Sequence, residues 1–102
     1  MAGYQRKTAL SPHEVFQKAE QVLPTLLAGM KRSGASDHGA TYGGPEGILE
    51  LSAHRHGPYT SVVAKTDKLR TSRLDYEVQR FLNRLPYEPG DQGGPGSGEP
   101  TR

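Results

Sequence analysis

The chain has 102 residues, of which 32% are hydrophobic, and its 13 lysines and arginines against 11 acidic residues give a net charge of +2. This length holds one small domain, and the absence of cysteine excludes a disulfide framework and thiolate chemistry. No apolar run approaches the roughly 18 residues of a membrane-spanning helix, and residues 1–14 lack the apolar core of a signal peptide. We therefore expect a cytoplasmic protein that does not enter a membrane.

The two ends of the chain differ in composition from the middle. Residues 86–102 contain nine glycines and prolines, and such a segment cannot offset the entropy lost on ordering, so we predict a disordered tail. The tail holds three acidic residues and one arginine, which leaves residues 1–85 with 12 basic and 8 acidic side chains, a net +4. Residues 1–10 are predicted to be a flexible N-terminal arm, and a single α+β domain then spans 11–85.

The first helix has a clear start signal. Ser11 is a suitable N-cap, Pro12 occupies the first helical position, and Glu14 follows the cap by three residues, which makes a capping box. Apolar residues then recur at helical spacing, so we predict a helix over 12–32. Pro24 lies inside this range and cannot donate a helical hydrogen bond, which predicts a bend there.

Residues 33–47 contain five glycines and one proline. We predict a long Gly-rich flexible loop, because loops of this length inside a compact domain are either functional or disordered. Its glycines do not match a phosphate-binding loop, since no Gly-Lys-Ser/Thr follows them. An extended piece at 40–42 that adds a third strand is the alternative.

A β-hairpin is predicted next. Leu49, Leu51 and Ala53 alternate with polar residues, which is typical of a half-buried strand. Gly57-Pro58 breaks the pattern, and 59–66 is rich in β-branched residues. The two strands are expected to be antiparallel.

The last predicted element is a second helix that starts at Ser72, with Asp75 three residues later in a capping position. Its apolar stripe consists of Leu74, Val78, Phe81, Leu82 and Leu85. The helix ends at Pro86.

The expected fold is therefore α+β, a small helix–β-hairpin–helix (α-β-β-α) domain with two helices packed on one face of an antiparallel sheet. A lone hairpin leaves both strand edges unpaired and is marginal in water. A symmetric dimer would join two hairpins into a four-stranded sheet. We therefore expect a homodimer.

Two histidines are the candidate metal ligands. His54 and His56 are two residues apart, so a strand places both imidazoles on one face. A zinc site needs three or four protein ligands, and only His38 and Glu50 are candidate additions, with no recognised spacing. The preferred interpretation is that both histidines are solvent-facing polar residues and that the chain holds no metal and no other cofactor.

The sequence carries no recognisable catalytic arrangement. None of its serines lies in a nucleophile-elbow motif, and the acidic residues are scattered rather than paired. We therefore predict that the protein is not an enzyme.

A basic stretch at 65–73 is the strongest remaining feature. It contains four cationic side chains where the second strand leads into the second helix: Lys65, Lys68, Arg70 and Arg73. A helix start with exposed N–H groups suits an anion, and these side chains suit phosphate contacts, to which Arg6 and Lys7 could add. The main hypothesis is a small protein-binding, dimeric interaction module. The alternative is a nucleic-acid-binding module that uses the basic stretch.

Overall fold

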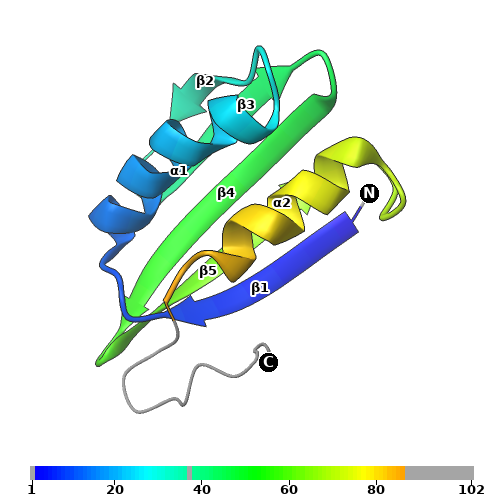
Figure 1. The fold of residues 1–102 in the computed structure, drawn as a ribbon. Coiled ribbons are helices and arrows are strands. Elements are labelled where there is room, and N and C mark those ends of the chain that lie inside the picture. Colours follow the sequence, from blue (N-terminus) through cyan, green and yellow to red (C-terminus); the bar gives the residue numbers. More distant parts are fainter. Residues whose placement is uncertain (1, 37, 87–102) are drawn as a thin grey trace.

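The computed structural model describes residues 2–36 and 38–86, and the predicted tail beyond Pro86 lies outside the described residues. The elements follow one another in the order β1 (Ala2–Thr8), α1 (Pro12–Leu26), β2 (Lys31–Ala35), β3 (Gly39–Gly44), β4 (Gly47–His56), β5 (Tyr59–Thr66) and α2 (Arg73–Asn83). The strands form one antiparallel sheet in the order β1-β5-β4-β3-β2. Both helices lie on the same face of this sheet (Figure 1).

The predicted α-β-β-α domain is wrong, although the α+β class stands. The β4–β5 hairpin forms as expected and turns at Gly57, which has a φ of +62°. Its edges are not free, because β3 pairs with β4 at Ala40–Leu51 and β1 pairs with β5 at Tyr4–Ala64. Both edges of the hairpin are therefore paired within one chain, so the hairpin needs no second copy to cover them.

The N-terminal residues form a strand and not a flexible arm. Strand β1 pairs with β5 along its whole length, from Ala2–Thr66 to Thr8–Thr60. Ala2 and Thr8 are buried on the helix side, while Gly3, Gln5 and Lys7 are exposed. The segment has few β-branched residues, so the open edge of β5 decides its conformation.

The Gly-rich segment forms strands rather than a long loop. Helix α1 ends at Leu26, earlier than predicted, and the chain turns at Gly29 (φ +85°) into β2. Strand β3 then follows, which was the alternative expected for 40–42. Gly44 serves close packing, because a Cβ there would lie 3.1 Å from the Gly29 carbonyl oxygen. Local composition indicates flexibility here, but pairing with β4 orders the segment.

Both helix starts are capped as predicted. The Ser11 Oγ accepts from the Glu14 N–H at 3.2 Å, and a Glu14 carboxylate oxygen accepts from the Ser11 N–H at 2.8 Å. The Ser72 Oγ accepts from the Asp75 N–H at 3.1 Å. Each cap satisfies backbone donors that a helix leaves unpaired at its N-terminus. Neither described helix is long and apolar enough to cross a membrane.

The core lies between the sheet and the two helices. Helix α1 covers the β2–β4 side and α2 covers the β5–β1 side (Figure 1). The largest fully buried side chains include Tyr42, Phe81, Leu23, Leu27, Leu49 and Leu51. The opposite face of the sheet is not covered by any element of the described part of the chain.

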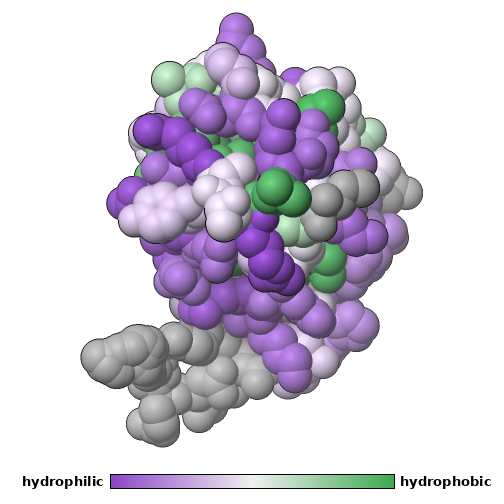
Figure 2. All heavy atoms as spheres, turned by 90° about the vertical axis from the view of Figure 1, so that its right-hand side faces the viewer, coloured by the Kyte–Doolittle hydropathy of each residue, from purple (hydrophilic) through white to green (hydrophobic). Residues whose placement is uncertain are grey.

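The surface seen from the side of β1 and α2 is mostly hydrophilic, with hydrophobic side chains in small separate spots (Figure 2). Among the described residues, the large hydrophobic side chains that are exposed are Ile48, Leu69 and Tyr76. Single exposed apolar residues are normal, and a large contiguous apolar patch is what marks a protein interface.

Candidate nucleic-acid interface on the open face of the sheet

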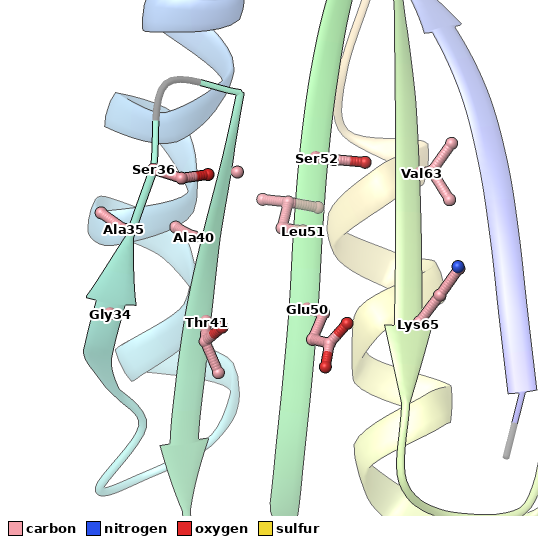
Figure 3. Close-up of a pocket in the computed structure, with 11 residues that line it drawn as sticks. Gly34, Ala35, Ser36, Ala40, Thr41, Glu50, Leu51, Ser52, Val63 and Lys65 are labelled. Carbon is pink, nitrogen blue, oxygen red and sulfur yellow. The ribbon is translucent and has the colours of Figure 1, made fainter.

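The open face carries the outward-pointing residues of each strand. On β4 these alternate with the buried residues Leu49, Leu51 and Ala53. Across the β4–β5 pairing, the outward residues meet as His56–Tyr59, His54–Ser61, Ser52–Val63 and Glu50–Lys65. Figure 3 looks onto this face, with the helices behind the strands.

Four rings and one ammonium group gather at one end of the open face. We call them the ring cluster: Lys7, His38, His54, His56 and Tyr59. The His38 and His54 ring centroids are 4.9 Å apart, and His56 stacks on Tyr59 at 5.6 Å. The Lys7 Nζ lies 4.9 Å from the centroid of the Tyr59 ring, at cation–π distance.

Strand register assembles the ring cluster from four segments of the chain. The tight turn at Gly57 pairs His56 with Tyr59. Ser61 on β5 is opposite both His54 on β4 and Lys7 on β1, which places those two side chains on flanking strands. A hydrogen bond from the Ala53 N–H to the His38 carbonyl oxygen, at 2.9 Å, holds the β2–β3 connection beside β4. The three histidines are exposed, and Tyr59 is half-buried.

A hollow of about 350 Å³ lies beside the ring cluster, over β2, β3, β4 and β5 (Figure 3). Gly34 and Gly39 contribute no side chain, which leaves the hollow unfilled. Its polar groups are the hydroxyls of Ser36, Thr41 and Ser52 and the side chains of Glu50 and Lys65. Ser52 precedes His54 by two residues on the same face of β4, so the hollow and the ring cluster are continuous.

The four residues of the predicted basic stretch do not share one surface. Lys65 lies on the open face at the hollow. The Arg70 guanidinium packs 4.9 Å from the Tyr4 ring and donates to the Gly3 carbonyl oxygen at 3.4 Å. Arg73 lies on α2, 4.0 Å from the Glu77 carboxylate. Lys68 is exposed in the connection between β5 and α2.

The two candidate metal ligands face different neighbours. The His54 ring lies against His38, and the His56 ring lies against Tyr59. Within residues 2–36 and 38–86, no three histidine, cysteine, aspartate or glutamate side chains lie close enough together to hold a metal ion.

One buried carboxylate lies on the opposite, helix-covered side of the sheet. Asp75 is fully buried and accepts hydrogen bonds from the hydroxyls of Tyr4 at 2.6 Å, Thr66 at 2.8 Å and Ser72 at 2.8 Å. Burial by itself raises the pKa of Asp75, but these hydroxyls, with Arg70 nearby, lower it by more, so the pKa lies below its ordinary value. The three donors come from β1, β5 and the start of α2, so the Asp75 carboxylate links these elements by hydrogen bonds.

His54, His56 and Lys65 were each predicted separately as candidate site residues, whereas Tyr59 was not. The alternation of Tyr59, Ser61, Val63 and Lys65 along β5 is the signal that could have placed Tyr59 on the outer face. No local signal brings Lys7 to the same place, because that contact depends on the pairing of β1 with β5.

Comparisons of this chain with protein-family models, with curated proteins and with solved structures gave no match.

Proposed function

We propose that this protein binds single-stranded nucleic acid on the open face of its sheet. The ring cluster is the observation that supports this proposal. Exposed planar rings on a β-sheet are suitable platforms for unstacked bases, and neighbouring cations neutralise the phosphates. A duplex keeps its bases stacked inside, so rings lying on a flat sheet suit a single strand better.

The groups around the rings fit the remaining parts of a nucleotide chain. Lys7 and Lys65 are cations on the open face and suit phosphate oxygens. The hydroxyls of Ser36 and Ser52 can donate to or accept from base edges in the hollow. Glu50 accepts from exocyclic amino groups of bases.

The test is fluorescence anisotropy with a short labelled oligothymidylate and with the matching duplex. We expect the single strand to bind more tightly than the duplex. Two phosphate contacts on a single strand predict a slope of about −1.4 in log affinity against log salt, which is about a sevenfold loss between 50 and 200 mM. Failure to bind at the lower salt concentration would refute the proposal.

Matched variants locate the contact surface. Tyr59→Ala should weaken binding at least about fivefold, because stacking on one aromatic side chain is worth about 1–3 kcal/mol. Tyr76→Ala is the control, because Tyr76 is an exposed tyrosine on α2. Lys65→Ala should weaken binding, and Lys68→Ala should not. The opposite result for the two lysines would favour the basic stretch over the open face.

A protein partner is the second candidate. The observation that favours it is the edge strand β2, whose five residues are all exposed. An exposed edge can accept an extended segment as an additional strand, although the irregular register between Arg32 and Gly34 restricts this pairing. Light scattering at tens of micromolar tests the case in which the partner is a second copy, and a monomer mass would exclude it.

A further inference from the structure

A second cavity, on the helix side of the sheet, has properties of a small-molecule site that is separate from the open face. Its volume is about 230 Å³, and it lies between α1 and the β2–β3 edge. We call it the Tyr42 cavity. Much of its wall is apolar, from Ala19, Leu23, Pro24 and Met30. Its size is below that of a typical drug pocket, so it suits a molecule the size of a single ring.

Tyr42 supplies an unpaired hydroxyl at this cavity. The residue is only 2% exposed, and its hydroxyl oxygen has no hydrogen-bond partner within the described part of the chain. A buried polar group without a partner costs about 1–3 kcal/mol, so a ligand that accepts from this hydroxyl would offset part of that cost. Burial, with a smaller contribution from Glu20, raises the pKa of Tyr42 to about 12, so the hydroxyl remains a neutral donor at physiological pH.

Pro24 in the same wall interrupts the hydrogen bonding of α1. Pro24 has no N–H, so it cannot donate the helical hydrogen bond to the carbonyl oxygen of Glu20, four residues earlier. Both residues line the cavity.

The Tyr42 hydroxyl is buried, and an exposed ion pair lies in the same cavity wall. Arg32 is the cross-strand neighbour of Tyr42, and its guanidinium lies 2.9 Å from the Glu20 carboxylate. The two side chains are 50% and 44% exposed. Exposed pairs of this kind contribute little to stability, so an occupant can shift the pair at low cost to reach the hydroxyl.

We propose that the Tyr42 cavity binds a small uncharged molecule that has a ring-sized apolar body and one oxygen that accepts from the Tyr42 hydroxyl. The apolar wall would contact the ring of the ligand, and the Tyr42 hydroxyl would donate a hydrogen bond to its oxygen. Much of the wall is apolar, which disfavours a charged ligand, and the charged side chains that also line the cavity are Glu20, Arg32 and Lys31.

The test is a titration of the isotope-labelled full chain with phenol, followed by backbone amide NMR, with toluene as the matched probe that lacks oxygen. We expect saturable shifts in α1 and β2–β3 that are stronger for phenol than for toluene. Tyr42→Phe should weaken phenol binding about 2- to 12-fold, which corresponds to one net hydrogen bond. It should leave toluene binding unchanged, and Tyr76→Phe should change neither.

Three outcomes of the titration would overturn the proposal: no saturable shift with phenol, equal phenol affinity in Tyr42→Phe, or shifts confined to the open face. Urea unfolding without ligand gives an independent check. Removing an unpaired hydroxyl should leave the midpoint of Tyr42→Phe unchanged or raise it. A clearly lower midpoint would mean that a bound water already satisfies the hydroxyl, which would also overturn the proposal.

Discussion

Replacing Tyr4 with phenylalanine should destabilise the fold through a single hydrogen bond. The Tyr4 hydroxyl donates to the Asp75 carboxylate at 2.6 Å, and Asp75 is fully buried. A hydrogen bond to a charged group is worth about 1.5–3 kcal/mol. Phenylalanine keeps the ring that packs under the Arg70 guanidinium. We therefore expect the free energy of unfolding at pH 7 to fall by about 1.5–3 kcal/mol.

The pH dependence of this loss identifies its cause. The pKa of Asp75 is lowered in the folded protein, so its contribution to stability is present above the ordinary aspartate pKa of about 3.9 and is lost as the pH falls through the folded value. Tyr4→Phe removes one of the groups that lower this pKa. The difference in stability between wild type and Tyr4→Phe should therefore shrink as the pH falls below about 4.

Urea unfolding followed by circular dichroism at pH 7 and pH 3 measures this difference directly. Tyr76→Phe serves as the control, because it removes the hydroxyl of an exposed tyrosine. A loss in Tyr4→Phe that is the same at both pH values would refute the reasoning, since it would show that the carboxylate charge is not involved.

Three further predictions concern the caps, the turns and Tyr42. Ser11→Ala should lower the free energy of unfolding by about 1 kcal/mol, because it removes the α1 capping box, and urea unfolding measures this. Gly47→Ala should reduce the thermal midpoint more than Gly57→Ala. Gly47 has a φ of +133°, and a Cβ there would lie 2.7 Å from the Asp67 carboxylate oxygen. Gly57 has a φ of +62°, and a Cβ there would meet no other atom of the described residues within 4 Å. Equal midpoints would contradict this. Ultraviolet titration should show one tyrosine that ionises near pH 12, and Tyr42→Phe should remove that step.

Strong local signals were sufficient for part of the fold. Ser11, Glu14 and Ser72 identify the two helix starts within a few residues, because capping depends on neighbours in sequence. Alternation and Gly57-Pro58 likewise identify the β4–β5 hairpin. Segments 2–8 and 31–44 carry no such signals. The first was predicted to be a flexible arm, and the second was predicted to be the end of a helix followed by a Gly-rich loop.

Those segments became strands because the hairpin had two unpaired edges, and pairing a backbone edge depends little on the side chains that pair with it. Such pairing joins residues that are far apart in sequence, as Tyr4 and Ala64 are, so no local pattern reveals it.

The candidate site likewise combines features that the sequence predicts with features that only the tertiary structure sets. The sequence by itself determined that His54 and His56 lie on the solvent side of a strand, because strand periodicity depends only on alternation. Tertiary structure alone decided that Lys7, His38 and Tyr59 join the two histidines, because strand register sets which side chains meet across a sheet. It likewise separated Arg70 and Arg73 from Lys65, since the chain turns away from the open face before α2 begins.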